Sequence, residues 1–107
     1  MRRFVTLRRK ADFIALRRRG RCVSTPILTL YRAASLPGDP SSLVGISVGK
    51  AIGIAVVRNK LRRRISAIIS DALPQRERMR LLVVPRPAAA SAPFATLRAE
   101  FTTALNR

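Results

Sequence analysis

The sequence contains no histidine, no tryptophan, a single cysteine and five acidic residues among its 107 positions. Without histidine, the chain lacks the commonest general acid–base side chain and the commonest metal ligand. The lone Cys22 cannot form an internal disulfide or, by itself, a zinc site, and it suits a reducing compartment. No two acidic residues lie closer than six positions: Asp12, Asp39, Asp71, Glu77 and Glu100. We therefore expect no catalytic side chain and no metal site in this chain.

Long apolar segments are also absent. The first ten residues lack the apolar stretch of about 7–15 residues that marks a secretory signal, and no segment approaches the roughly 18 apolar residues of a membrane span. The arginine-rich, acid-poor start has the composition of a mitochondrial presequence, so a processed organellar protein is one alternative. Residues 7–19 fit better as part of the fold, and we expect a cytoplasmic protein with no membrane partner.

Positive charge dominates what is present. The chain carries 22 Lys and Arg, and its formal net charge is +17. A hydrophobic content of 48% argues against disorder, and the length predicts one domain over residues 1–107. Repulsion of this size destabilises a compact chain, so a polyanionic partner is the natural reason for tolerating it. The basic clusters at 8–10, 17–21 and 58–64 predict contact with nucleic acid, without separating RNA from DNA.

Hydrophobic periodicity and turn-forming residues predict the elements. The spacing predicts helices at 11–19, 55–72 and 94–105 and strands at 26–32, 43–48 and 80–84. Within the strand at 80–84, the uniformly apolar run 81–84 suits a strand that is covered on both faces. The 55–72 helix has one apolar stripe, made of Val57, Leu61, Ile65, Ile68 and Ala72. We predict an α+β fold with helices packed on one small sheet.

The central helix concentrates the charge. Residues 58–64 hold five cations, which repel one another at the i,i+3 and i,i+4 spacings, and Asp71 is seven residues beyond Arg64. An anion along this helix would relieve the repulsion and release counterions. A simply solvated basic face is the alternative interpretation, but the net charge and the three clusters favour nucleic acid.

Residues 44–63 resemble the signature of the bacterial ribonuclease P protein family, Gly-hydrophobic-Ser-Val-x-Lys-Lys-x-Gly-x-Ala-Val-x-Arg-Asn-Arg-hydrophobic-Lys-Arg. The resemblance extends along nearly the whole chain, from Asp12 and Phe13 to the segment 83–87. It implies a protein subunit that binds a catalytic RNA and the 5′ leader of precursor tRNA, assisting endonucleolytic removal of the leader. It also implies that the RNA carries the catalysis and uses Mg²⁺, while the protein binds no cofactor and no small-molecule substrate.

The same resemblance implies a fold and two RNA-facing surfaces. The fold is a two-layer α-β-β-β-α-β-α sandwich with residues 21–24 as its first strand and a left-handed crossover, against the usual right-handed rule. The surface toward the catalytic RNA comprises Lys50, Arg58, Asn59, Lys60, Arg62 and Arg63. The cleft for the leader, between the sheet and the first helix, comprises Phe13, Arg17, Tyr31 and Arg62. Unpaired bases stack on aromatic faces for about 1–3 kcal/mol each, although Phe13 also fits a helix core position.

Several positions depart from the family pattern. They are Ala51 for a lysine, Lys60 for an arginine, Arg17 and Leu28 for aromatic residues, and Ser66 for a frequent arginine, with Arg64 nearby. We therefore expect weaker base stacking and stronger phosphate attraction in the cleft. For Cys22 we expect a buried thiol, as is usual for a free cysteine. The main alternative function is a small basic ribosomal protein, and a basic DNA-binding domain follows it.

Overall fold

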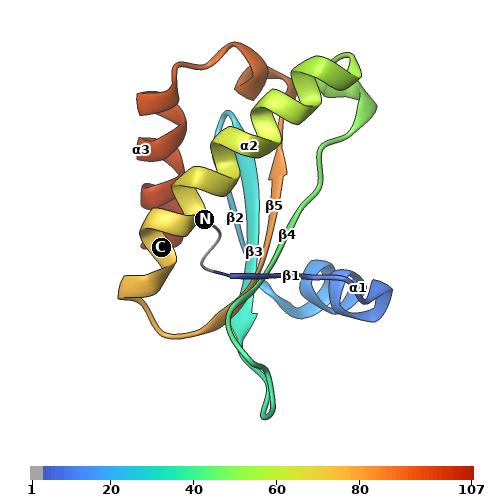
Figure 1. Cartoon of the computed structure of the whole chain (residues 1–107), viewed down its shortest axis with the longest axis vertical. Coiled ribbons are helices and arrows are strands. Elements are labelled where there is room, and N and C mark those ends of the chain that lie inside the picture. The colour runs from blue at the N-terminus through green and yellow to red at the C-terminus, as the bar shows by residue number, and fades with distance from the viewer. Residues whose placement is uncertain (1–3) are drawn as a thin grey trace.

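The computed structural model describes residues 4–107. Over these residues five strands form one mixed sheet, accompanied by three α-helices (Figure 1). The strands are β1 (Val5–Thr6), β2 (Arg21–Ser24), β3 (Leu28–Ala34), β4 (Leu43–Ile46) and β5 (Met79–Pro85). The helices are α1 (Lys10–Arg19), α2 (Ala55–Ala72) and α3 (Phe94–Leu105), with short 3₁₀ turns at 50–52, 73–75 and 87–91. The predicted α+β class is confirmed, and 21–24 is the strand that the resemblance implies.

The strands are arranged in the order β1-β4-β5-β3-β2. β4 is parallel to both β1 and β5, whereas β3 is antiparallel to β5 and β2. The parallel neighbours β4 and β5 are connected through α2, which makes α2 the crossover helix of the fold. The register aligns Gly45, Leu82, Tyr31 and Cys22 in one row across β4, β5, β3 and β2. Residues in such a row point to the same face of a sheet.

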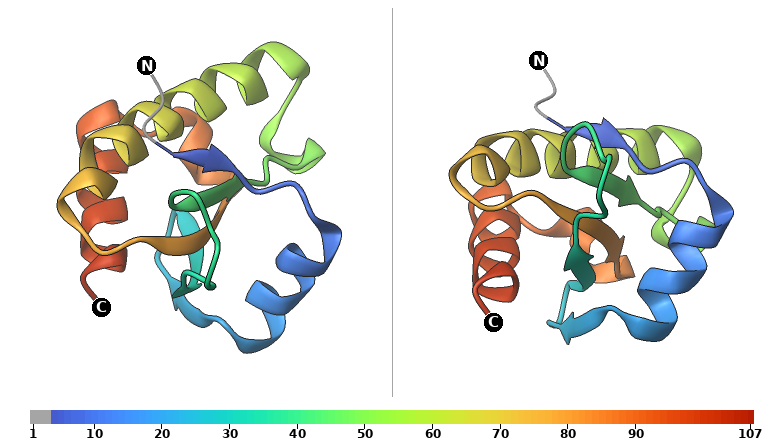
Figure 2. Two further views of the ribbon diagram at one scale, coloured as in Figure 1. Left: turned by 60° about the horizontal axis from the view of Figure 1, so that its bottom comes forward. Right: turned by 90° about the horizontal axis from the view of Figure 1, so that it is seen from below.

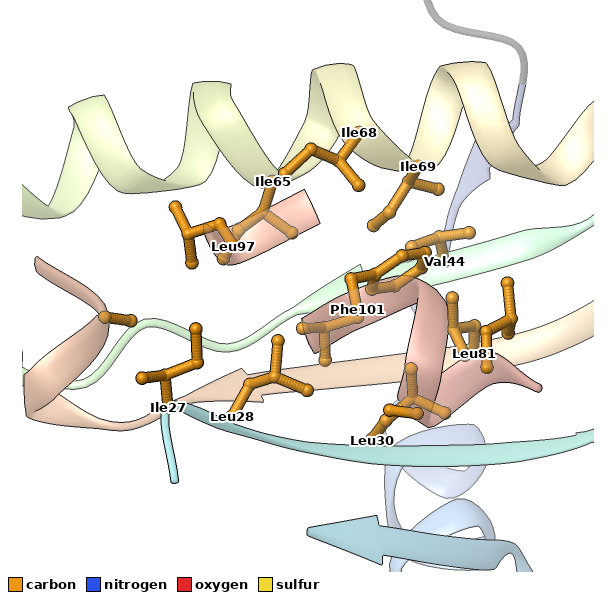
Figure 3. Packing of buried hydrophobic residues seen from close by; sticks show 14 of the residues in the cluster. Ile27, Leu28, Leu30, Val44, Ile65, Ile68, Ile69, Leu81, Leu97 and Phe101 are labelled. Carbon is orange, nitrogen blue, oxygen red and sulfur yellow. The ribbon is translucent and has the colours of Figure 1, made fainter. Parts of the chain in front are cut away.

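The two faces of the sheet are covered by different helices (Figure 2). The main core lies under α2 and α3, where Ile65 and Phe101 pack with strand residues such as Leu81 (Figure 3). A smaller cluster on the opposite face joins Leu16 of α1 to Leu82 of β5. Full burial of each such side chain contributes about 1.5–3 kcal/mol. β5 is thus covered on both faces, as its apolar run predicts.

The N-terminal edge strand is absent from the sequence-based prediction. β1 has two residues and pairs with β4 through bonds from Val5 N to Ser42 O (2.9 Å) and from Leu7 N to Val44 O (2.8 Å). Two residues are too few to show the alternation that identifies a strand in a sequence. Residues 5–19 form β1, its continuation and α1, so this arginine-rich segment belongs to the domain.

Strand β3 starts two residues later than predicted. The Thr25 hydroxyl oxygen accepts bonds from Ile27 N (3.3 Å) and Leu28 N (3.2 Å), which closes a local turn before the strand begins. The segment 49–53, which connects β4 to α2, contains one 3₁₀ turn and ends at Gly53, whose φ of 148° favours glycine. None of the helices within residues 4–107 has the length and apolar character needed to cross a membrane.

Candidate nucleic-acid interface

Helix α2 places its apolar residues on the core and its cations at the surface. Leu61, Ile65 and Ile68 are 2–3% exposed, whereas Lys60, Arg62 and Arg63 are exposed. The ends of the predicted stripe, Val57 and Ala72, are only half-buried, and Ile69 is fully buried instead. Helix periodicity fixes the angular position of each side chain, but the elements packed against the helix decide how far the buried arc extends.

The cations of α2 differ in what they contact. Arg62 Nη1 donates to Asn59 Oδ1 over 2.9 Å, one turn earlier on the same exposed face. Arg64 Nη1 donates to the Ala92 carbonyl over 3.4 Å and thereby links α2 to the segment before α3. Arg58 is half-buried, and its Nε has no hydrogen-bond partner. Arg64 therefore has a structural contact, while Arg62 and its neighbours face solvent.

Acidic partners for these cations are scarce. Within residues 4–107 the structure contains one ion pair, between Arg98 and Asp71 at 3.5 Å, and both side chains are largely exposed. That pair joins α3 to the C-terminal part of α2, away from the 58–64 cluster. The clusters at 8–10 and 17–21 are also exposed. The surface thus has broad positive areas that a polyanion can neutralise.

A hollow of about 440 Å³ lies between the edge of the sheet and α2. We call it the β1–α2 hollow, and its lining residues are Phe4, Thr6, Val44, Ile46, Asn59, Arg62, Arg63 and Ser66. The sequence prediction includes the α2 residues Asn59, Arg62 and Arg63 but not Phe4 or Thr6. Two aligned features make the hollow: the parallel pairing of β1 with β4 and the α2 face above that edge. No periodic signal in residues 4–7 could have revealed this pairing.

On the opposite face of the sheet, Phe13 of α1 lies over the row defined above. A Cβ atom added at Gly45 would lie 2.8 Å from Phe13 Cε1 and 3.3 Å from Leu82 Cδ1, so the absence of a side chain at Gly45 makes room for the ring. Phe13 is half-buried and packs against the smaller cluster. Phe13 is therefore a packing residue that stays partly accessible, and its contact with the leader stays a prediction.

One turn further along α1, the Arg17 guanidinium lies over the Tyr31 ring, with its carbon 5.9 Å from the ring centroid. This distance is within the range of cation–π attraction. Tyr31 is half-buried, and the adjacent Cys22, paired with it across β2 and β3, is exposed. The prediction of a buried Cys22 is wrong, because its alternation in β2 directs it toward the α1 face while Val23 enters the core.

The structure therefore groups the predicted residues into two sets. Phe13, Arg17 and Tyr31 lie together on the α1 face, whereas Arg62, predicted for both surfaces, lines the β1–α2 hollow on the other face. Lys50 is exposed in the 3₁₀ turn between β4 and α2. The departure at Leu28 does not affect the α1 face, because this side chain is 1% exposed and belongs to the main core.

An α+β sheet domain with cations along the exposed face of one helix and a cation–aromatic pair on the other face of its sheet has the features of a nucleic-acid-binding protein. Within residues 4–107, no three His, Cys, Asp or Glu side chains gather as a metal site would require. The family model for ribonuclease P matches residues 1–107, and the chain belongs to that family as a bacterial ribonuclease P protein component.

Individual relatives agree with this assignment. The ribonuclease P protein component of Acidothermus cellulolyticus is 43% identical over 104 residues, covering 94% of this chain and 85% of that protein. The Streptomyces bikiniensis protein component is 36% identical over 109 residues, covering 94% and 89%. The chain is therefore a subunit of an endoribonuclease of tRNA processing and a partner of the ribonuclease P RNA. This assignment replaces the ribosomal and DNA-binding alternatives.

Solved structures agree on the fold. The Staphylococcus aureus RNase P protein superposes with a TM-score of 0.84 at 23% identity, covering 94% of this chain and 92% of that chain. The Thermotoga maritima RNase P protein gives a TM-score of 0.78 at 23% identity, covering 92% of each chain. At such identities the agreement concerns the backbone arrangement and not individual contacts.

Proposed function

We propose that the two faces of the sheet bind two different RNAs. Helix α2, together with Lys50, contacts the catalytic RNA, and the α1 face binds the single-stranded 5′ leader of precursor tRNA. The catalytic RNA and its Mg²⁺ ions perform the cleavage, and the protein positions the substrate. The complex of protein and RNA works in the cytoplasm. Support comes from the chemistry of the faces, since the α2 side exposes cations and the α1 side combines aromatic and cationic groups.

The α2 face has the chemistry of a phosphate-binding surface. Exposed Lys60, Arg62 and Arg63 lie on one helix without an acidic partner, so bound phosphates would replace their counterions. Arginine forks match phosphate oxygens in pairs, whereas Lys60 contributes a point charge. Asn59 adds a neutral donor beside Arg62. This combination suits the phosphate backbone of an RNA.

The observation that carries the leader assignment is the Arg17–Tyr31 pair on the α1 face. Guanidinium planes and aromatic rings both stack on unpaired bases with little sequence demand. Phe13 lies one helical turn away and keeps part of its ring exposed. Ser24 and Thr29, whose hydroxyl oxygens lie 3.3 Å apart on the same face, extend the surface with polar groups. A strand with variable sequence, such as a tRNA leader, fits this surface.

The test compares precursor tRNA with mature tRNA. Tyr31→Ala in the reconstituted holoenzyme should weaken precursor binding by about 1–3 kcal/mol, the value of one stacked base, and leave mature tRNA binding unchanged. Phe94→Ala is the matched control, because Phe94 is an exposed aromatic residue of α3, remote from this face. An equal loss of affinity for precursor and mature tRNA would mean that Tyr31 has a structural role and does not contact the leader.

The single cysteine provides a second readout without any mutation. Exposed Cys22 is the neighbour of Tyr31 across the strand pair, and the chain has no other thiol. Bound leader should slow the alkylation of Cys22 by iodoacetamide in the holoenzyme with precursor tRNA, but not with mature tRNA. Identical alkylation rates with both ligands would contradict the proposed position of the leader.

A further inference from the structure

The β1–α2 hollow has a composition that the bulk attraction of RNA to α2 does not explain. Its volume of about 440 Å³ falls within the range of small-ligand pockets, about 300–1,000 Å³. One wall is the end of the N-terminal segment with Phe4, and the other is the α2 face with Arg62 and Arg63. A phosphate surface requires cations but needs neither a recess nor an aromatic wall.

The lining groups are those that recognise a nucleotide. Phe4 is half-buried, packs against the main core and borders the hollow, so it is held in place as a stacking platform. Asn59 accepts from Arg62 through Oδ1, which leaves its amide nitrogen to donate to a base edge. Arg63 adds a second guanidinium, and none of the five acidic residues lines the hollow. The site therefore combines an aromatic face, an amide and two cations.

We infer that the β1–α2 hollow binds one unpaired nucleotide of the catalytic RNA. The base lies against Phe4, and its flanking phosphates lie at Arg62 and Arg63. This inference deepens the proposed function, on which it rests, because it adds a defined base-binding site to the α2 surface. The positive surface continues from the hollow along α2, because exposed Lys60 lies on the same helix. A continuous positive surface favours an RNA chain over a free nucleotide as the occupant of the hollow.

The first experiment uses the isolated full chain and adenosine 5′-monophosphate as the probe. NMR titration should shift the signals of Phe4, Thr6, Asn59 and Ser66, with an affinity at least tenfold above that of ribose 5-phosphate, which lacks the base. Phe4→Leu retains apolar volume for folding and should reduce this difference. Phe94→Leu is the matched control and should leave it unchanged.

The second experiment measures the affinity for the cognate catalytic RNA at several salt concentrations. Phe4→Ala should weaken binding by about five- to 150-fold, the range of one base–aromatic stack, with an unchanged salt slope. Phe4→Leu, checked by its melting temperature, should give a smaller loss in the same direction. Both effects follow because the ring contributes stacking and no counterion release.

Three outcomes separate the possible failures. The inference is overturned if Phe4→Leu and Phe4→Ala fold and bind the catalytic RNA like the parent, even when the mononucleotide occupies the hollow. The proposed function survives that result if Lys60→Ala still weakens RNA binding. Failure of the cationic variants as well would remove α2 from the RNA interface and overturn both.

Discussion

The contact between Gly45 and Phe13 shows how one missing side chain positions another. Gly45 is buried in β4, and the Phe13 ring occupies the space where its Cβ would be. Glycine is required here by this close approach, since it is not one of the residues with positive φ. The glycine of the family signature therefore supports the α1 face, although it lies far from Tyr31 in the sequence.

We expect Gly45→Ala to destabilise the protein by about 1–3 kcal/mol, the usual cost of overpacking a core. The added methyl would lie 2.8 Å from Phe13 Cε1, so the ring must shift. Urea unfolding gives the free energy, and precursor tRNA affinity reports the shift of α1.

The double variant Gly45→Ala/Phe13→Leu provides the control, because a smaller side chain makes room for the methyl. Its loss should be smaller than the sum of the two single losses. Additive losses would show that the ring and the methyl do not compete for space.

At the scale of the element, the cations of α2 fall into two groups, those exposed to solvent and one that contacts a neighbouring segment. Lys60, Arg62 and Arg63 are exposed and have no acidic partner, whereas Arg64 is half-buried and bonded to the Ala92 carbonyl. The same residue type is thus exposed to solvent at one position and takes part in packing at another. The sequence shows five cations within residues 58–64, and only the contact with the segment before α3 distinguishes Arg64 from the exposed ones.

The triple variant Lys60→Ala/Arg62→Ala/Arg63→Ala should fold normally and bind the catalytic RNA more weakly. Loss of like-charge pairs removes a few tenths of a kcal/mol of repulsion each, so its melting temperature should stay level or rise. Each lost phosphate contact should reduce the slope of log K against log salt by about 0.7–0.9. RNA affinity across a salt series, with thermal melting of the free protein, checks both effects.

Two single variants serve as controls for that series. Asn59→Ala should weaken RNA binding at an unchanged slope, because a neutral amide releases no counterion. Arg64→Ala should lower stability by about 0.5–1.5 kcal/mol, the value of one hydrogen bond. An early-melting triple variant with the parent's salt slope would mean that the exposed cations are structural.

At the scale of the whole molecule, charge repulsion and compactness oppose each other. The chain carries +17 within principal extents of 38 × 27 × 26 Å. The Debye length is about 30 Å at 0.01 M salt and about 10 Å at 0.1 M. At the lower concentration most charges therefore act on one another, and at the higher one only neighbours interact.

The free protein should consequently melt at a higher temperature as NaCl rises from about 0.01 M to about 0.1 M, with a smaller change above that. Binding of the catalytic RNA should show the opposite trend and weaken with salt. Differential scanning fluorimetry of the protein and filter binding of the complex measure the two. A melting temperature independent of salt would mean that the charges are too dispersed to strain the fold.

Much of the fold follows from local patterns. The helices at 55–72 and 94–105 occur at their predicted bounds, and the apolar run within β5 is covered on both faces. These features depend on periodicity and turn residues, which a single segment contains. β1 depends instead on hydrogen bonds to β4, almost forty residues away, so two residues of sequence could not reveal it.

The sequence by itself determined the class of partner and the family. Net charge and the run of cations on one helix favour a polyanionic partner, and the signature at 44–63 identifies the ribonuclease P protein family. These properties belong to composition and to contiguous residues, so folding does not alter them. The order of the three helices and of β3, β4 and β5 is equally local, because each of these segments has its own pattern.

The tertiary structure alone decided which of these residues act together. Strand register aligned Tyr31 with Cys22 and Gly45, and α1 brought Arg17 and Phe13 onto the same face. The pairing of β1 with β4 and the seating of α2 placed the predicted leader residue Arg62 beside the N-terminal segment instead. Alternation along a strand places neighbouring side chains on opposite faces of the sheet. Only the packing between distant segments determines which helix covers each face.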